Sequence, residues 1–505
     1  MLMWIIFFTV TIICFVILLT PKYWKKKNIP YLNPRPLVGN FGPLIRRQCS
    51  IAELIQRIYN SHPNHRYFGA YQFLLPTLVL RDPELIKKVT VREFDTFPEH
   101  RTIALEGADS LLSKNIFFMK GGEKWHTLRC TLSPAFTSSK MKIMFNLMQE
   151  CANQFTEYFE NRAGVITLEM KDAFTRYAND VIGSTAFGIT CNSLKDKDNE
   201  FYVMGLKATK ISPFTGLKMF MQTISPSLAK MLQLSIIPKF IQNFFVNIIQ
   251  ESITLRNEKG IVRPDMIHLL MEARKGKLKY DDKMNEEDSG FATAQESEMG
   301  KSNNTLKSSI TDRDIAAQAF AFFMAGFDTS ATAMCFAAYE LAINSDIQHR
   351  LQREIDEVLL TNQGKVTYET LLGMTYMDQV VSETLRKWPP ATFTDRKSVA
   401  PFTIEPELPH EGIVEFEKGT VCWIPIYAIH RDPLYYPNPD VFDPERFTKK
   451  NLSNIKPYTY LPFGIGPKNC IGKQKLQMEW TKIKFCTCRF EICTFRNKIN
   501  PVYTS

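Results

Sequence analysis

The amino-acid sequence predicts a mainly α-helical protein with small β-sheets, preceded by one transmembrane helix at its N-terminus. Long stretches place apolar residues at helical spacing, for example Met141 to Arg162, Ile347 to Leu359 and Asp378 to Trp388. Short β-type runs appear near Tyr67 to Leu80 and between Phe402 and Ile426. The first residues are almost entirely apolar, which adds the membrane helix to this fold class.

The predicted membrane helix covers residues 1–20, which carry no charge. About 20 apolar residues are enough to span a bilayer. Lysines follow at once, and the positive-inside rule keeps them in the cytosol, so the N-terminus would face the lumen; they are Lys22, Lys25, Lys26 and Lys27. A cleaved secretory signal is the alternative, but no basic stretch precedes the run and no small-residue cleavage site ends it.

Residues 21–40 are expected to form a basic, proline-rich linker, because Pro30, Pro34 and Pro36 cannot continue a helix. We assign residues 41–505 to one catalytic domain, since no internal repeat divides them. The stretch from Arg274 to Ser309 is polar and charged, and it is expected to be a long surface loop.

The composition limits the possible partners. The chain has 505 residues, of which 45% are hydrophobic, and a formal net charge of +10. Its basic residues are scattered and are not interleaved with stacking aromatics, so nucleic acid is not expected as a partner. The chain has 11 cysteines, without the paired spacing of a disulfide framework or a zinc site, which places most of it in a reducing compartment.

One cysteine lies in a glycine-rich loop, Phe463-Gly464-Ile465-Gly466-Pro467-Lys468-Asn469-Cys470-Ile471-Gly472. The glycines and the proline predict a tight loop. A helix is expected from Lys473 onward, so Cys470 would lie at a helix N-terminus, where free amides and partial positive charge favour a thiolate. Such a thiolate can approach a flat macrocycle and ligate its iron. By itself, the loop is also compatible with a purely structural role.

A second motif lies in an apolar helix that is predicted to begin at Thr311, with Asp314 completing a capping box. From Ile315 to Tyr339 the only formal charge is Asp328, and Thr329 follows it. A threonine hydroxyl can bond to a carbonyl one turn earlier and distort a helix. Together the two residues offer a pocket for oxygen and a route for protons, although a core helix with one partnered acid gives the same pattern.

Two further pairs say little in isolation. Glu383 and Arg386 share a helix face, and Arg446 could complete a charged network with them. Trp125 and Arg129 are also one helical turn apart and point the same way. Each of these residues, taken alone, is as compatible with an ordinary surface or core position.

All four motifs together resemble those of the cytochrome P-450 family. The similarity is strongest to microsomal members, and it looks like the insect xenobiotic-metabolising branch over residues 29–40, 132–142 and 315–319. The resemblance implies the cytochrome P-450 fold, haem b (iron protoporphyrin IX) as cofactor, and a haem-dependent monooxygenase that inserts one oxygen atom from dioxygen into a lipophilic small molecule.

The resemblance also implies roles for single residues. Cys470 would be the metal ligand, and Phe463 and Lys468 belong to the cofactor-binding loop. Asp328 and Thr329 would be catalytic, through proton delivery. The remaining cofactor-binding candidates would hold the haem propionates; they are Trp125, Arg129, Arg396 and, more weakly, Arg101. Glu383, Arg386 and Arg446 would support the haem loop structurally.

One position departs from the family pattern. The family usually has arginine two residues before the cysteine, and here Lys468 keeps the charge but loses the bidentate fork. Two alternative functions follow. A haem-thiolate isomerase or dehydratase would work without a reductase, and a non-catalytic haem-binding membrane protein would have lost turnover. The pairing of Asp328 with Thr329 argues against the isomerase.

Partners and location follow from the same resemblance. Electrons would come from the NADPH-dependent flavoprotein reductase, with cytochrome b5 as a second partner, at the cytosolic face of the endoplasmic reticulum membrane. The stretch from Pro213 to Phe245 is apolar and is expected to touch the membrane. Substrate choice is expected to depend on the segment from Arg101 to Phe118 and on Phe322, Phe323 and Phe393, although core packing explains those aromatics equally well. The xenobiotic class is expected, and hormones or lipids remain open.

Overall fold

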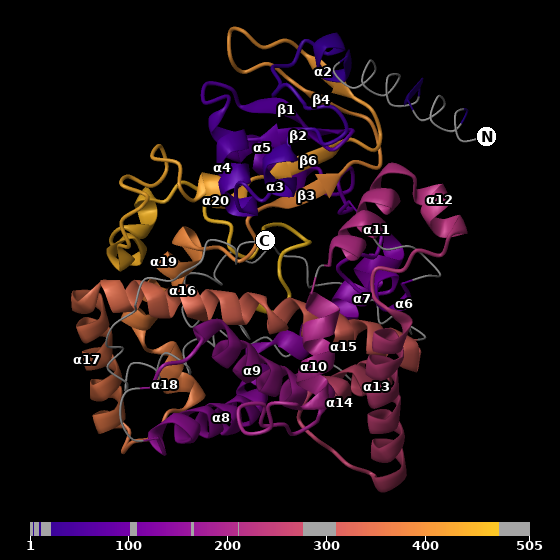
Figure 1. Ribbon diagram of the computed structural model, residues 1–505. Coiled ribbons are helices and arrows are strands. Elements are labelled where there is room, and N and C mark those ends of the chain that lie inside the picture. The colour runs from indigo at the N-terminus through magenta and orange to yellow at the C-terminus, as the bar shows by residue number, and fades with distance from the viewer. Residues whose placement is uncertain are drawn as a thin grey trace.

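The chain folds into a large helical part and a smaller part built on a sheet (Figure 1). The computed structural model describes residues 4, 10–11, 22–101, 109–162, 166–210, 212–275 and 310–473. Most of the predicted membrane helix over residues 1–20, most of the predicted loop from Arg274 to Ser309, and the predicted helix after Lys473 lie outside the described residues.

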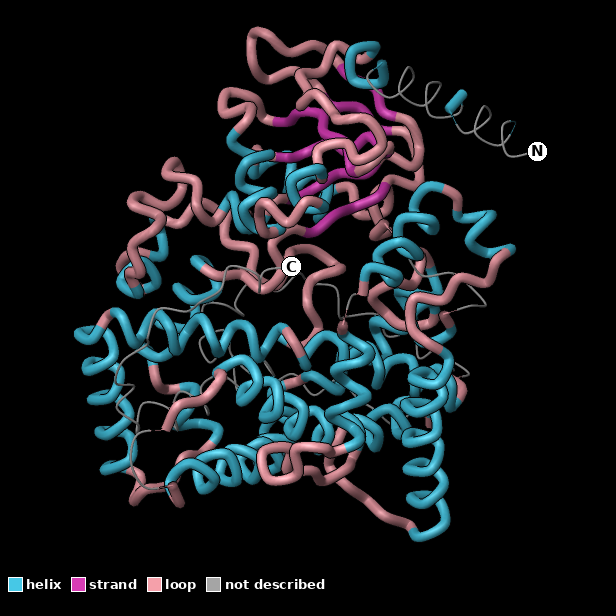
Figure 2. The backbone as a smooth tube through the Cα atoms, in the orientation of Figure 1, coloured by secondary structure: helices cyan, strands magenta, loops and turns pink. Residues whose placement is uncertain are grey.

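Most described residues outside loops are helical (Figure 2). The helices that surround the sheet are α2 (Lys22–Lys26), α3 (Gly42–Ile45), α4 (Ile51–Asn60), α5 (Pro83–Lys87), the π-helix η1 (Lys88–Arg92) and α20 (Ile426–Ile429). The helical part contains α6 (Ser110–Ser113), α7 (Glu123–Leu132), η2 (Ser133–Phe136), α8 (Ser138–Glu160), α9 (Met170–Ile182), η3 (Gly183–Phe187), α10 (Glu200–Thr209), α11 (Pro213–Ile224), α12 (Pro226–Met231), α13 (Lys239–Lys259), α14 (Met266–Arg274), α15 (Asp312–Phe327), α16 (Thr329–Ile343), α17 (Ser345–Thr361), α18 (Tyr368–Leu372) and α19 (Thr375–Lys387), and later come the short turns η6 (Pro444–Phe447) and η7 (Leu452–Asn454).

The larger sheet joins the two ends of the described chain. Its strand order is β1-β2-β6-β3, and a separate hairpin pairs β4 with β5. The strands are β1 (Tyr67–Gln72), β2 (Leu75–Leu80), β3 (Thr394–Lys397), β4 (Phe402–Ile404), β5 (Val414–Phe416) and β6 (Val421–Ile424). Strand β2 runs parallel to β6, with Thr77 opposite Val421. This pairing places the N-terminal strands beside the segment that leads into the cysteine loop.

The proline-rich segment from Trp24 to Asn40 contacts the larger sheet. The amide of Gly69 in β1 donates to the Pro30 carbonyl at 2.8 Å, and the amide of Asn40 donates to the Tyr71 carbonyl at 2.9 Å. A Cβ atom at Gly69 would lie 2.4 Å from the indole of the buried Trp24. The segment from Trp24 to Asn40 is therefore packed on the sheet as part of the folded domain, because its free backbone groups pair with the edge of β1.

The predicted helices and strands occur with small shifts at their ends. The three helical stretches named above correspond to α8, α17 and α19, and the two β-type regions to β1–β2 and β4–β6. Strand β3 was not predicted. Helix α15 begins at the predicted capping box, in which the Thr311 hydroxyl accepts from the Asp314 amide at 3.2 Å.

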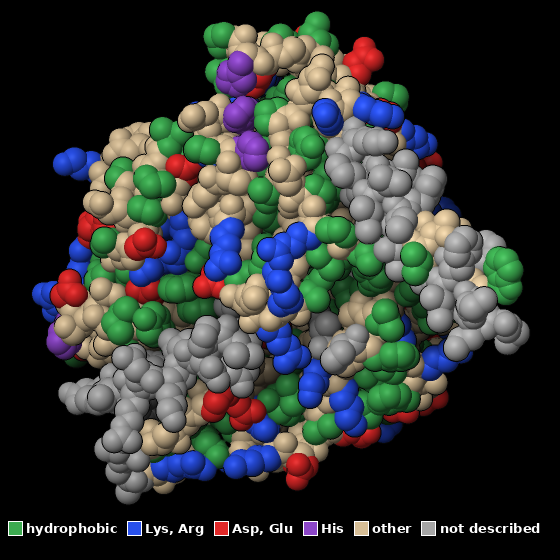
Figure 3. Space-filling model, turned by 45° about the horizontal axis from the view of Figure 1, so that its top comes forward, with side chains coloured by type: hydrophobic (Ala, Val, Ile, Leu, Met, Phe, Trp, Pro, Cys, Tyr) green, Lys and Arg blue, Asp and Glu red, His purple; other side chains and the backbone are tan. Residues whose placement is uncertain are grey.

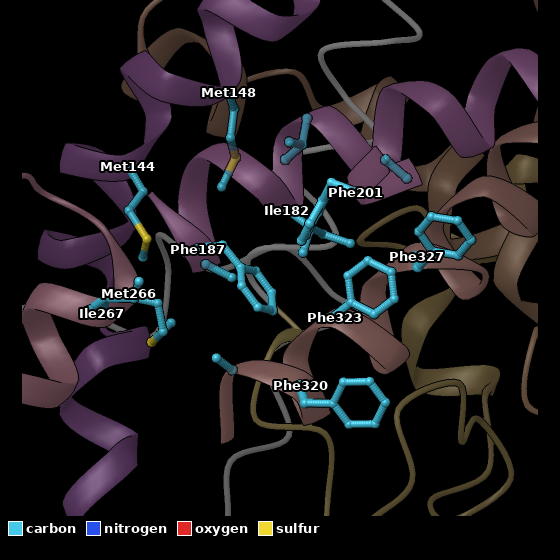
Figure 4. Packing of buried hydrophobic residues seen from close by; sticks show 14 of the residues in the cluster. Met144, Met148, Ile182, Phe187, Phe201, Met266, Ile267, Phe320, Phe323 and Phe327 are labelled. Carbon is cyan, nitrogen blue, oxygen red and sulfur yellow. The ribbon is translucent and has the colours of Figure 1, made fainter. Parts of the chain in front are cut away.

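Helices α15 and α16 form the centre of the helical part. Phe320, Phe323 and Phe327 point from α15 into a cluster with Phe187 and Phe201 (Figure 4). The segment Asp312–Ile343 is long and apolar enough to cross a membrane. Its buried side chains pack against this core, so it is a core helix of the domain.

Candidate active site

The cysteine loop is folded back on itself at its base. The Cys470 amide donates to the Phe463 carbonyl at 2.8 Å, and the Asn469 amide donates to the Gly466 carbonyl at 2.9 Å. Gly464 and Gly466 have φ angles of 68° and 76°, which side-chain-bearing residues rarely adopt. The predicted tight loop is thus present, and its glycines are needed for its conformation.

Gly466 is also required by a distant part of the chain. A Cβ atom at this position would lie 1.9 Å from the carbonyl oxygen of Thr90 in the π-helix η1. Thr90 is buried, and its hydroxyl donates to the Ile86 carbonyl at 2.6 Å. The N-terminal part of the chain therefore fixes the outer turn of the cysteine loop, with no room for a larger residue.

The environment of Cys470 shifts the pKa of its thiol in both directions. Burial raises the pKa of its thiol, whereas a hydrogen bond from the Gly472 amide and the positive charges of Arg129 and Lys473 lower it. The residue as a whole is nevertheless exposed. Cys470 is thus accessible to a ligand, and a bound metal cation would reverse the effect of burial by favouring the thiolate.

Two cations lie at the loop, the buried Arg396 and the partly buried Lys468 of the loop itself. Arg396 in β3 donates to the Ile465 carbonyl at 3.1 Å, and its Nε atom is buried without a hydrogen-bond partner. Lys468 lies over the Trp125 ring at 4.8 Å and donates to the Met119 carbonyl at 3.3 Å. Burial and the neighbouring charge of Arg396 lower the pKa of Lys468 to about 7. An anionic group between these side chains would give the Arg396 Nε atom a hydrogen-bond partner and would raise the pKa of Lys468.

Helix α7 is docked directly on the cysteine loop. The Arg129 guanidinium donates to the Asn469 side chain at 2.7 Å, next to Cys470. The Trp125 indole donates to the Ile116 carbonyl at 3.0 Å, so in this structure its N–H is engaged by the backbone. The structure therefore brings Arg129, Trp125 and Lys468 together around one side of the loop.

The base of the loop is held by the predicted charged triad. Arg386 forms two hydrogen bonds with Glu383, at 2.7 and 2.8 Å, and both side chains are fully buried. Arg446 approaches Glu383 at 3.6 Å, which confirms the predicted network. Arg386 also donates to the carbonyl of His430 at 2.9 Å, and His430 in turn accepts from the Leu461 amide at 2.8 Å. This chain of bonds connects the triad to the start of the loop.

The helix that carries the predicted proton-delivery pair is broken at that pair. Asp328 separates α15 from α16, and the Thr329 hydroxyl donates to the Ala325 carbonyl. The exposed Asp328 carboxylate accepts from Lys171 of α9 at 2.6 Å, and the same ammonium group donates to the Thr332 hydroxyl at 2.6 Å. The predicted distortion is present, with a cationic partner for the acid.

The broken helix and the cysteine loop are close. A Cβ atom at Gly472 would lie 3.9 Å from the Phe136 ring, and the Phe136 ring lies 5.1 Å from the Phe322 ring of α15. Phe463 and Ile471 of the loop also pack against the core cluster that includes α15. The Phe136 and Phe322 rings thus connect the end of the cysteine loop with α15.

Comparison with known proteins decides the family. The sequence model described as Cytochrome P450 matches residues 29–483. The chain belongs to the cytochrome P450 family. It is 46% identical to Cytochrome P450 9e2 of Blattella germanica over 93% of this chain and 88% of that protein. It is 38% identical to Probable cytochrome P450 9f2 of Drosophila melanogaster (90% and 86%), and 37% identical to Cytochrome P450 6k1 of Blattella germanica (89% and 83%).

Membership confirms the predicted enzyme class and cofactor. Cytochromes P450 are haem-thiolate monooxygenases that bind haem b. The site described above fits this group, because the exposed Cys470 is available for iron and the unpartnered Arg396 Nε atom is available for a propionate. The mainly helical fold with small sheets is likewise confirmed.

Three residues near the P450 site were missed by the sequence analysis. His100 pairs with Asp395 at 3.0 Å, and Asp395 also accepts from the Arg101 amide at 2.8 Å. Burial and the charges of Arg396 and Lys468 lower the pKa of His100, which places it in the same charged cluster. Lys171 was missed as the partner of Asp328. These pairs join residues from separate segments, so no local motif could reveal them. The Arg101 side chain itself donates to Gln72.

Proposed function

We propose that this P450 is a membrane-anchored monooxygenase of lipophilic small molecules, with Cys470 as its iron ligand. The substrates are xenobiotics or endogenous hormones and lipids. Residues 1–20 anchor the chain in the endoplasmic reticulum membrane, and the following domain lies on the cytosolic face. Electrons come from an NADPH-dependent flavoprotein reductase, with cytochrome b5 as a second donor. The single observation that carries this proposal is the exposed Cys470, in a loop that is bonded to the buried Arg396 and contains the partly buried Lys468.

The residues around the loop have distinct tasks in this proposal. Arg396, Lys468 and Arg129 would hold the haem propionates, because guanidinium and ammonium groups suit carboxylates. Trp125 supports Lys468 through its ring, and Phe463 would pack beside the haem. When bound, haem supplies the activation of dioxygen and the transfer of one oxygen atom to the substrate.

Proton delivery is assigned to the helix break. The exposed Asp328 carboxylate exchanges protons with solvent, and Lys171 holds it in place at 2.6 Å. The Thr329 hydroxyl, which is bonded to the Ala325 carbonyl in this structure, passes a proton to the site when that bond is exchanged.

The burial of Phe322 and Phe323 on α15 suggests a different role for each. Phe323 is fully buried in the cluster of Figure 4, so core packing is its role. Phe322 is only partly buried, and its neighbours include Phe136, which lies beside Gly472. Phe393 stacks obliquely on Trp423 of β6, with ring centroids 4.9 Å apart. We assign pocket lining to Phe322 rather than to Phe323.

The membrane contact is supported by the surface of α11, α12 and α13. Large apolar side chains are exposed there; they are Phe214, Leu217, Leu228, Met231, Leu232 and Phe240. The stretch from Phe201 to Gln250 contains no Asp or Glu, and its charged residues are all lysines: Lys207, Lys210, Lys218, Lys230 and Lys239. Figure 3 shows a face of the molecule on which hydrophobic and basic side chains lie side by side. Such a surface suits the anionic cytosolic leaflet.

The test is the absorbance difference spectrum of the reduced, carbon monoxide-treated protein in membranes. A strongly red-shifted Soret band is expected for thiolate ligation, and Cys470→Ala should abolish it. Cys130→Ser is the matched control, since Cys130 lies on α7 and its sulfur contacts the exposed His126 at 3.7 Å. A band at the shorter wavelength of a neutral axial ligand in the unmodified protein would refute thiolate ligation.

A second measurement separates the function from its alternatives. Product formation from a lipophilic probe such as an alkoxycoumarin is expected only with NADPH and the reductase. Rearrangement of an organic hydroperoxide without NADPH, together with no reductase-dependent oxidation, would favour the isomerase. A normal thiolate band with no oxygen consumption in the presence of the reductase would leave only non-catalytic haem binding.

A further inference from the structure

A buried carboxylate joins two segments that flank the proposed substrate pocket. Asp109, just before α6, has only 1% of its surface exposed. It accepts hydrogen bonds from the Ser235 hydroxyl at 2.5 Å, the Ile236 amide at 2.9 Å and the Ile237 amide at 3.2 Å. We call Asp109 with these three residues the Asp109 clasp. Removing such an acceptor would leave buried donors without a partner, which is costly.

A glutamine reinforces the Asp109 clasp from α13. The Ser110 hydroxyl donates to the Gln242 side-chain oxygen at 3.3 Å. The Gln242 amide group donates to the Ser235 hydroxyl at 3.0 Å and to the Ile237 carbonyl at 2.9 Å. Gln242 is also buried. The turn at residues 235–237 is therefore held from two directions, by the start of α6 and by the first turn of α13.

The segment that follows Asp109 is fixed at its other end to α15. The Gln318 side chain of α15 accepts from the Ile116 amide at 2.9 Å and donates to the Lys114 carbonyl at 2.9 Å. The Trp125 indole also binds this segment, because it donates to the Ile116 carbonyl at 3.0 Å. Residues 109–118 therefore connect the helix of the proton-delivery pair to the Asp109 clasp.

The turn at residues 235–237 is fixed on its other side to α11. Lys218 donates to the Ser235 carbonyl at 2.9 Å, and Gln222 donates to the Leu234 carbonyl at 2.5 Å. Helix α11 also carries the exposed Phe214 and Leu217 of the proposed membrane contact. The Asp109 clasp thus lies between the surface from which lipophilic molecules would arrive and the segment packed on α15.

We propose that Asp109 is a positioning residue that limits the size of the lipophilic molecules that reach the haem. Bulky molecules that pass between α11 and the 109–118 segment must separate these two segments, and the Asp109 clasp holds them together. This inference rests on the proposed function, since it assumes that the membrane-facing helices admit the substrate. The Asp109 clasp, which lies outside the pocket, would select substrates by size, and the apolar residues in the pocket would set the binding affinity.

The experiment uses the full-length haem protein and a graded series of phenyl-, biphenyl- and bulkier arylimidazoles, whose ring nitrogen binds the iron and shifts the Soret band. Stopped-flow absorbance gives association and dissociation rates. Asp109→Asn replaces the acceptor carboxylate by a neutral amide of the same shape. We expect both rates to rise several-fold for the bulkiest probe and to stay within about twofold for phenylimidazole, with the dissociation constant nearly unchanged.

Asp180→Asn is the matched control. Asp180 in α9 is also a buried carboxylate that accepts a backbone hydrogen bond, from the Ser193 amide at 2.9 Å, but it lies outside the Asp109 clasp. This variant should leave all rates unchanged. Ser235→Ala, which removes one donor without changing the charge, should shift the rates in the same direction as Asp109→Asn by a smaller factor, and it provides the test if Asp109→Asn fails to fold.

Hydrogen exchange distinguishes the failure of this inference from the failure of the proposed function. Asp109→Asn should accelerate amide exchange at Ile236 and Ile237, a readout that needs neither haem nor activity. Faster exchange with unchanged rates for every imidazole would overturn the selective role and leave a purely structural contact. Equal acceleration for small and bulky probes would overturn it as well. Absence of any imidazole-induced shift in the unmodified protein would instead count against the proposed haem site.

Discussion

The backbone amide of Cys470 donates to the carbonyl oxygen of Phe463 at 2.8 Å. This bond commits the cysteine's own amide to closing the loop, so that amide cannot stabilise the sulfur. The sulfur instead receives a hydrogen bond from the Gly472 amide. The Cys470 amide thus fixes the conformation of the loop, and the Gly472 amide lowers the pKa of the thiol.

Gly466→Ala is expected to reduce both stability and haem content. The substitution combines a positive φ with a Cβ atom 1.9 Å from the Thr90 carbonyl, so backbone must move. Gly364 offers a matched control, because its φ is 77° and nothing lies within 4 Å of its Cβ position. Gly364→Ala should lose only the conformational contribution of about 1–2 kcal/mol, measured by urea unfolding. Equal losses in the two variants would contradict the close contact.

Glu383→Gln is expected to destabilise the domain strongly. It leaves the fully buried Arg386 without its charged partner, and uncompensated buried charges cost about 3–5 kcal/mol. Glu369→Gln removes the same charge from the exposed pair with Lys142, where a loss of about 0–1 kcal/mol is expected. Thermal unfolding of the two variants gives the comparison, and a similar shift for both would show that the triad is not important for stability.

Thr329→Val should uncouple electron consumption from product formation. The variant keeps the side-chain shape but removes the hydroxyl assigned to proton delivery, and positioned proton donors typically contribute about 100-fold or more. The measurement is the yield of product and of hydrogen peroxide per NADPH consumed. Thr361→Val is the control, since the Thr361 hydroxyl makes the same type of bond, to the Glu357 carbonyl at the end of α17. Unchanged yields in Thr329→Val would exclude the assigned role.

Acidification is expected to destabilise the protein through His430. Burial and the charge of Arg386 lower the pKa of His430 to about 3. The unfolded chain binds a proton at this side chain below about pH 6.5, whereas the folded protein does not, so stability is lost as the pH falls. The contribution of this group is about 1.4 kcal/mol per pH unit between those values.

Urea unfolding at about pH 7.5 and about pH 5.5 tests this dependence. His430→Asn should be less stable at the higher pH, because a hydrogen bond with the Leu461 amide or the Arg386 carbonyl is weakened, but its stability should change less between the two pH values. A pH dependence as steep as that of the unmodified protein would show that other groups are responsible.

The local motifs of the site could be predicted from the sequence, because their chemistry is encoded in consecutive residues. The glycines of the cysteine loop, the capping box at Thr311 and the i,i+3 pair of Glu383 and Arg386 all take the expected local geometry. Each depends on backbone conformations or spacings that neighbouring residues determine.

Other features depend on distant contacts and could not be predicted. Asp328 meets Lys171, and His100 meets Asp395, only after separate helices and strands have packed. The contacts of the proline-rich segment with the sheet have the same cause. Its prolines prevent a helix, as predicted, but the free backbone groups between them find partners in β1, which the sequence of the segment alone does not indicate.

The contact between Thr90 and Gly466 also bears on the order of events during synthesis. The cysteine loop is shaped by a carbonyl that leaves the ribosome long before the loop does. The β1–β2 hairpin can therefore form early, whereas the rest of its sheet and the iron ligand reach their final geometry only when nearly all of the chain is available. Haem capture would then be a late step of biogenesis, and shortened translation products that end before the loop would be unable to sequester the cofactor.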